Sequence, residues 1–188
     1  MLFKKKEISD EEKLSKAIEA LQRGSAEAFH ILYHNYAHKV YRFCLRMLGE
    51  QELAEDAFQE TFIRVYENKG SFHGTNFAAW LFTIARNTCL NHIRSKKEAE
   101  SFDEVFHSYD NGSNQSDPVL KQEIEKAIAT LPVPMREALL LREYEDFSYQ
   151  EIADTLGIEL SLAKVRVHRA RLQLRKLLKP LVKELNES

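Results

Sequence analysis

The chain has 188 residues, 44% of them hydrophobic and 30% charged, and a formal net charge of −2 at pH 7. This length suits one ordinary domain or two small ones, and the composition excludes a chain that is disordered throughout. No apolar run approaches the roughly 18 residues of a membrane span, and the basic start MLFKKKEISDEEK lacks the apolar core of a signal peptide, so we expect a cytoplasmic protein. Cys44 and Cys89 both fall in apolar helical pattern, which predicts buried reduced thiols.

The charge is unevenly distributed along the chain. Residues 1–97 have 15 basic and 12 acidic residues, residues 98–160 have 4 and 15, and residues 161–188 have 8 and 2. The three segments therefore carry net charges of +3, −11 and +6. A basic end beside an acidic middle is informative because local potential decides which polyanion can approach.

Apolar residues recur every three or four positions and alternating runs are absent, so the sequence predicts an all-α fold. The expected helices cover about 14–21, 29–47 with Gly49 as C-cap, 54–66, and 77–97 after a turn at 68–76. Residues 98–118 are rich in Ser, Asn, Asp and Gly and predict a flexible acidic linker. After it we expect helices from Asp117 and Pro118 to 131, over about 135–144, from Ser148 to Gly157, and from about 160 onward. The prediction is two small helical domains joined by a linker.

The helix that starts at Ser148 is strongly specified by its sequence. Ser148 and Glu151 form a capping box, and Phe147 and Ile152 are placed as a hydrophobic staple. Gly157 then favours a left-handed turn before a second, basic helix. A capped helix, a glycine turn and a basic helix together are typical of a helix-turn-helix.

The basic helix has three kinds of face. An apolar stripe of Leu160, Ala163, Val167, Ala170, Leu174, Leu177 and Leu181 is expected to pack inward. The opposite crest holds Ser161, Val165, His168 and Arg169, and the flanking walls hold Lys164, Arg171 and Arg175 on one side and Arg166 on the other. Such a face suits the major groove, with the crest toward base edges and the walls toward phosphates.

Most basic faces of helices are simply solvated, and this is the alternative to DNA binding here. Seven Lys or Arg and no Asp or Glu lie between residues 161 and 179, directly behind the capped helix and its glycine turn. This combination favours DNA binding over a solvated face.

Two helices of the N-terminal part also carry candidate surfaces. The helix at 54–66 has Glu55, Asp56, Gln59 and Glu60 opposite its apolar stripe, but outward carboxylates without a partner helix do not predict a metal site. The spacings of His34 with His38 and of Cys89 with His92 likewise predict ordinary helix residues rather than metal ligands. The helix at 77–97 has apolar residues on two sides and a basic C-terminal end, which fits either a core helix or a surface for single-stranded nucleic acid.

Three stretches, taken together and in this order, resemble the extracytoplasmic-function (group 4) sigma factors of bacterial RNA polymerase. They are AEDAFQETFIRVYE (54–67), FAAWLFTIARNTCLNHIRSKK (77–97) and LPVPMREALLLREYEDFSYQEIADTLGIELSLAKVRVHRAR (131–171). The resemblance implies sigma domain 2 at 1–97, the linker at 98–118 and sigma domain 4 at 119–188. It also implies a promoter-specificity subunit with no catalytic residues, no cofactor and no metal, whose partners are core RNA polymerase, promoter DNA and an anti-sigma protein.

The resemblance further implies three sets of contact residues. The clamp helices of polymerase would meet Glu55, Asp56, Gln59, Glu60 and Arg64, while the flap would receive the remainder of domain 4. The −10 element would be bound and kept melted by the turn at 68–76 and by Phe72, Trp80, Arg86, Asn87, Asn91 and Arg94, with one base flipped into a pocket. The −35 element would be read by Ser161, Lys164, Val165, Arg166, His168, Arg169 and Arg171.

Two positions depart from the pattern of that family. Glu159 stands where Ser or Thr is frequent, so it caps the basic helix less well and repels phosphate, with Ser161 as an alternative cap. Val165 stands where a small polar residue is frequent and is suited to a thymine methyl group. A helix-turn-helix repressor or activator that acts without polymerase is the rival interpretation, but it leaves the acidic face of Glu55 to Glu60 without a role. A helix-turn-helix recombinase is disfavoured because the sequence shows no nucleophile paired with a clustered set of catalytic arginines.

Overall fold

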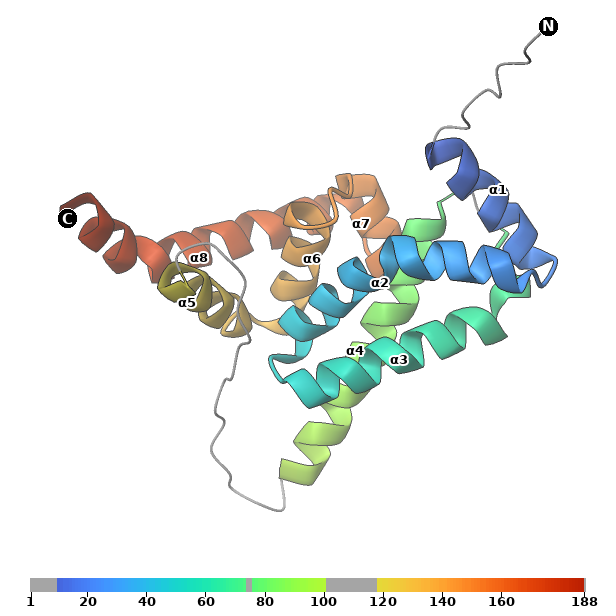
Figure 1. Cartoon of the computed structure of the whole chain (residues 1–188). Helices are drawn as coiled ribbons and strands as arrows, with labels where there is room; N and C mark the ends of the chain where they lie inside the picture. The colour runs from blue at the N-terminus through green and yellow to red at the C-terminus, as the bar shows by residue number, and fades with distance from the viewer. Residues whose placement is uncertain (1–9, 74–75, 101–117, 188) are drawn as a thin grey trace, which may run out of the picture.

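The computed structural model describes residues 10–73, 76–100 and 118–187, and every regular element in these ranges is helical (Figure 1). The N-terminal half consists of α1 (Asp10–Gln22), α2 (Ala26–Leu48), α3 (Gln51–Glu67), the 3-10 helix η1 (Lys69–Ser71) and α4 (Phe77–Glu100). The C-terminal half consists of α5 (Pro118–Ala129), α6 (Val133–Glu143), α7 (Tyr149–Leu156) and α8 (Leu160–Glu187). The all-α prediction is confirmed. None of the described helices combines the length and the apolar character needed to cross a bilayer.

In the N-terminal half, α2, α3 and α4 pack on one another and α1 packs on α2. The ends of α2 follow from local sequence. The Ser25 side chain accepts a hydrogen bond from the Ala28 amide at 3.2 Å, and Gly49 closes the helix in the left-handed conformation at φ 77°. The largest fully buried side chains of this half are Leu21, Leu32, Phe43, Met47, Leu81 and Phe82.

Both cysteines lie in this core as free thiols, as the sequence predicts. The pKa of Cys89 is raised well above its ordinary value, first by a hydrogen bond with Cys44 and then by burial. Cys89 therefore stays protonated at neutral pH and acts as a packing residue.

In the C-terminal half, the capping box and the glycine turn are both present. Ser148 Oγ accepts from the Glu151 amide at 3.2 Å, and Glu151 Oε2 accepts from the Ser148 amide at 2.7 Å. Gly157 ends α7 with φ 64° and ψ 42°, and α8 follows three residues later. Phe147 and Ile152 are both buried, as expected of a hydrophobic staple. The helix-turn-helix is thus built as the sequence indicates.

Some predicted details differ from the structure. Helix α6 begins at Val133, two residues before the expected start, because Pro134 is tolerated in a first helical turn. Ser161 lies inside α8 and is not its cap, since the Ala163 amide already bonds to the Glu159 carbonyl at 3.0 Å. Leu160 and Leu177 were expected to pack inward, but Leu160 is 36% exposed and Leu177 is 45% exposed.

The helix ends and core packing explain these exposed leucines. Leu160 is the first residue of α8, and Leu177 comes after Ala170, the last residue of α8 in the buried core. Helix α4 runs to Glu100, whereas the linker was predicted to begin at residue 98. Most of that linker, residues 101–117 with Asp117 as the expected cap, lies outside the described residues.

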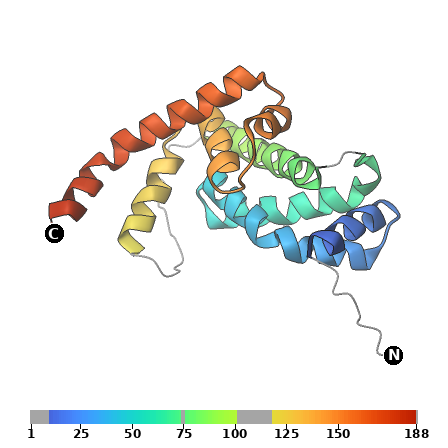
Figure 2. The same ribbon diagram turned by 90° about the horizontal axis from the view of Figure 1, so that it is seen from above.

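The two halves lie against each other. Helices α5 and α6 contact α2, and α7 contacts α4, an arrangement visible from two directions in Figures 1 and 2. Phe82 of α4 and Phe147, just before α7, meet edge to face with ring centroids 5.6 Å apart. Buried residues of both halves consequently form one continuous hydrophobic cluster.

Candidate nucleic-acid and polymerase interfaces

The crest of α8 predicted to face DNA points to solvent. Three small residues, Ala163, Val167 and Ala170, are fully buried against the rest of the C-terminal half. Their burial turns the opposite face outward, and that face has five exposed side chains: Ser161, Lys164, Val165, His168 and Arg169. This short ridge is cationic and partly apolar and carries no carboxylate, which is the character needed to approach a DNA groove.

The two remaining arginines of the predicted −35 set are held by carboxylates of α6. Arg166 Nη1 lies 3.1 Å from Glu137 Oε1, and Arg171 Nε lies 2.8 Å from Glu143 Oε1. The hydrogen bond with Glu143 raises the pKa of Arg171 above its ordinary value. These arginines therefore differ from Lys164 and Arg169, for which the described residues supply no ion pair.

The residues predicted to bind the −10 element divide into two groups. Asn87, Asn91 and Arg94 are exposed along α4. Phe72, in contrast, is 3% exposed, with its ring centroid 5.3 Å from that of half-buried Trp80. Phe72 thus supports the turn before α4 from within, while residues 74–75 of that turn lie outside the described residues.

Arg86, which belongs to the same set, points toward the C-terminal half. Its Nε donates to Glu137 Oε2 at 2.8 Å, and only 21% of its side chain is exposed. Asn76 also links the halves, because its Oδ1 accepts from the Ala79 amide at 2.9 Å while its Nδ2 donates to Glu151 Oε1 at 2.6 Å. The start of α4 is therefore tied to the start of α7.

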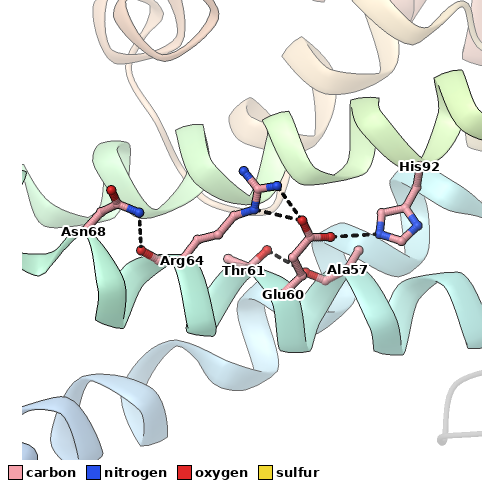
Figure 3. A network of polar contacts seen from close by, with 6 residues as sticks. All are labelled: Ala57, Glu60, Thr61, Arg64, Asn68 and His92. Carbon is pink, nitrogen blue, oxygen red and sulfur yellow. Dashed lines mark hydrogen bonds and ion pairs between the residues drawn. The ribbon is translucent and has the colours of Figure 1, made fainter.

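The acidic face of α3 is exposed at Glu55, Asp56 and Gln59, as the sequence predicts. Glu60 is different, because it lies between Arg64 on its own helix and His92 on α4 (Figure 3). Arg64 Nε is 2.8 Å from Glu60 Oε1, and His92 Nε2 is 3.2 Å from Glu60 Oε2. Burial raises the pKa of Glu60, but these two hydrogen bonds outweigh it, and the resulting pKa is lowered. Glu60 is therefore ionised, and its contact with His92 links α3 to α4.

Two apolar side chains accompany this acidic face. Ile63 is 57% exposed, and Tyr66 is 43% exposed with its ring against Phe29. These two side chains give the outer face of α3 a mixed acidic and apolar character.

Among the described residues, no group of three His, Cys, Asp or Glu side chains is placed to hold a metal ion. His34 faces His30, with the two Nε2 atoms 3.0 Å apart, and His92 is engaged by Glu60.

Sequence reasoning missed three residues that join helices: Asn76, His92 and Glu137. Asn76 had a detectable signal, since it is an N-cap residue type directly before an apolar helix. Glu137 had none, because a single acidic residue inside the apolar run of α6 does not disclose partners 51 positions earlier and 29 positions later.

Each half of the chain matches a known protein family. The family described as Sigma-70 region 2 matches residues 32–99, and the family described as Sigma-70, region 4 matches residues 121–174. The RNA polymerase sigma-H factor of Pseudomonas aeruginosa is 34% identical over 182 residues, covering 89% of this chain and 94% of that protein. The ECF RNA polymerase sigma factor SigW of Bacillus subtilis is 34% identical over 183 residues, covering 89% and 98%. The chain belongs to the extracytoplasmic-function group of sigma-70 factors. It is a specificity factor for transcription initiation.

Two solved structures have a fold similar to that of this sigma factor. One, described as the sigma factor RpoE in complex with the anti-sigma factor NepR from Bartonella quintana, is 29% identical with a TM-score of 0.76. The matched region covers 82% of this chain and 98% of the RpoE chain. CnrH in complex with the cytosolic domain of CnrY is 20% identical with a TM-score of 0.71, over 89% of this chain and 98% of its own, and shows the same fold.

Proposed function

We propose that this sigma factor reads promoter DNA with two surfaces, the crest of α8 at the −35 element and the outer side of α4 at the −10 element. One observation carries the proposal: the outward face of α8 presents Lys164 and Arg169 around Val165, without an acidic residue. Lysine and arginine there would bind phosphates or guanine edges, and Val165 would contact a thymine methyl group.

In this proposal the chain has the domain organisation of its family. Residues 1–97 form domain 2, residues 98–118 the linker, and residues 119–188 domain 4. Asn87, Asn91 and Arg94 on α4, beside Trp80, would hold the melted −10 strand through base stacking and charge. Arg86 would join them once it is free of Glu137.

The acidic face of α3 would dock on the clamp helices of core polymerase, with Ile63 and Tyr66 adding apolar contact. The flap would bind domain 4, and an anti-sigma protein would compete for these surfaces. The factor would act in the cytoplasm, where core polymerase works. It would lower the barrier to promoter melting by binding the open strand and would carry out no covalent step.

Charge reversal on α3 tests the polymerase contact. We expect Asp56→Arg to weaken binding to core polymerase by at least about tenfold, because an acidic docking face favours a partner surface of opposite charge, which the new cation would repel. Glu19→Lys, an exposed reversal on α1, is the matched control and should leave the affinity unchanged. Equal affinities of the Asp56 variant and wild type, with both folded by circular dichroism, would place the polymerase contact elsewhere.

A further inference from the structure

Two histidines on the outer side of α2 have ring nitrogens that point toward each other. His30 and His34 lie one helical turn apart, and their Nε2 atoms are separated by 3.0 Å. The ring centroids are 4.2 Å apart, and the ring planes are inclined by 71°. Both side chains are exposed, so a solute can reach the two nitrogens. Neutral imidazole nitrogens are the commonest metal ligands in proteins, and a pair at this helical spacing is a known arrangement for binding one ion.

The packing of α2 holds the backbone of this pair in place. Leu32, between the two histidines in sequence, is 1% exposed, and its burial turns the opposite side of the helix outward. Tyr33 packs against Phe62 of α3 with ring centroids 4.8 Å apart. The ring of His34 in turn meets Tyr33 edge to face at 5.9 Å. The two nitrogens are therefore brought together by a helix that is fixed on its other sides.

The distance between the two Nε2 atoms suits a shared metal ion. A bond from an imidazole nitrogen to a divalent metal is about 2.0–2.1 Å long. At that length, two ligands at a right angle lie about 2.9 Å apart, and two tetrahedral ligands lie about 3.3 Å apart. The observed 3.0 Å is closer to the right angle, which is found in tetragonal Cu²⁺ and Ni²⁺ sites.

A hydrogen bond between the rings is the other use of the same atoms. One Nε2 then carries a proton, and the other accepts it. Such a bond on an exposed surface competes with water and contributes little to stability. A metal ion replaces this single proton, and a small rotation of the exposed rings directs both lone pairs at the ion.

We propose that His30 and His34 form a two-ligand site for a late first-row divalent metal ion, Cu²⁺ or Ni²⁺ in preference to Zn²⁺. No third His, Cys, Asp or Glu side chain joins the pair among the described residues, so solvent completes the coordination and the site is an open one. The two nitrogens act as a chelate, because binding of the first raises the effective concentration of the second. The sequence predicted ordinary helix residues at His34 and His38, and the approach of His30 to His34 is the observation that changes this for His34.

The inference is independent of the proposed function. Neither histidine belongs to the residues predicted to meet polymerase or DNA, so the site can be present or absent whichever promoter the factor reads. A bound ion joins two successive turns of α2, and binding to the folded chain alone stabilises the fold.

Three single variants of the full-length protein, prepared without a histidine tag, test the site. His30→Gln and His34→Gln each remove one proposed ligand. His38→Gln is the matched control, because His38 is exposed on the same helix one turn after His34. Isothermal titration with CuCl₂, NiCl₂, ZnCl₂ and MgCl₂ measures the affinity, and circular dichroism checks that each variant is folded.

We expect wild type to bind one Cu²⁺ most tightly, then Ni²⁺, with Zn²⁺ weaker than Cu²⁺ and no binding of Mg²⁺, which prefers oxygen ligands. His30→Gln and His34→Gln should each weaken Cu²⁺ binding by at least about tenfold, because the chelate is lost. His38→Gln should bind as wild type does. The electron paramagnetic resonance spectrum of bound Cu²⁺ should show coupling to two nitrogens in wild type.

Two results would overturn the site. Equal Cu²⁺ affinities of wild type and all three variants would place the bound ion elsewhere on the chain. A loss in His34→Gln and His38→Gln, but not in His30→Gln, would show that the ligands are the other histidine pair of α2. Neither result bears on transcription, which is measured without added transition metal.

Discussion

Lys164 and Arg169 are the residues through which α8 would recognise DNA. Both are exposed, Arg169 on the crest of α8 and Lys164 on the wall beside it, and no Asp or Glu lies between residues 161 and 179. Replacing either by alanine should weaken −35 binding by about 1–3 kcal/mol if the side chain contacts a base edge, with loss of preference at that base pair. If it contacts phosphate alone, the loss should be uniform across sequences and the salt dependence should fall.

The measurement is binding of the polymerase complex to a panel of −35 variants at two salt concentrations. Lys179→Ala is the control, because Lys179 is exposed on the same helix about 22 Å beyond Lys164 and about 15 Å beyond Arg169, at 1.5 Å per residue. If the Lys164 and Arg169 variants both bind the whole panel as wild type does, α8 is not the recognition helix.

Glu145, in the segment between α6 and α7, should make stability depend on pH. Burial raises its pKa to about 7, although Lys39, Arg46 and Arg42 of α2 act in the opposite direction. One of its oxygens, Oε2, is buried without a hydrogen-bond partner among the described residues. The folded protein therefore prefers the protonated carboxyl, whereas the unfolded chain ionises it near pH 4.5. Stability from this group is complete below about pH 4.5 and is lost as the pH rises toward 7.

Glu145→Gln should consequently raise the free energy of unfolding at pH 8 by about 1–2 kcal/mol. Each unit of pKa shift corresponds to about 1.4 kcal/mol, and the total is reduced here because the residue is not fully buried. At pH 5 the gain should be much smaller. Thermal unfolding at both pH values measures this, with Glu123→Gln as the control for the lost charge. A gain that is equal at both pH values would show that Glu145 is not held protonated.

At the scale of elements, helix ends were predictable where one or two neighbouring residues decide them. Ser148 and Glu151 cap α7, Gly157 ends it, and Gly49 ends α2, because each capping contact spans only a few residues. The surfaces on α3 and α8 were predictable for a related reason, since helical spacing alone turns one face outward once the apolar face is buried.

Contacts between distant residues were not predictable from local pattern. Glu137 meets arginines on two other helices, and Asn76 meets Glu151 across the halves. One indirect signal existed for the helix at 77–97, whose apolar residues lie on two sides. Phe82 uses the second side against Phe147 of the C-terminal half.

The turn between α7 and α8 gives a direct stability prediction. Gly157 has φ 64°, and an added Cβ would meet nothing within 4 Å, so the cost of a side chain is purely conformational. Gly157→Ala should destabilise the protein by about 1–2 kcal/mol, because L residues disfavour this backbone region. Urea unfolding measures the change. Gly70→Ala, which also meets no atom within 4 Å and has no such φ, is the control and should change stability far less.

At the scale of the whole molecule, the net charge of −2 conceals separate surfaces with separate tasks. The basic crest of α8 and the acidic face of α3 lie on different halves, and the acidic middle of the sequence includes residues 101–117, outside the described residues. A protein with this separation can bind a polyanion and a cationic protein surface at once.

As a sigma factor, this chain confers promoter choice on core RNA polymerase. The most direct measurement is transcription from a promoter library by purified core polymerase with and without the purified chain. We expect start sites at a limited set of promoters that share −35 and −10 motifs and that depend on the chain. Start sites that are the same with and without the chain, although it is folded and in excess, would show that the chain does not direct promoter choice.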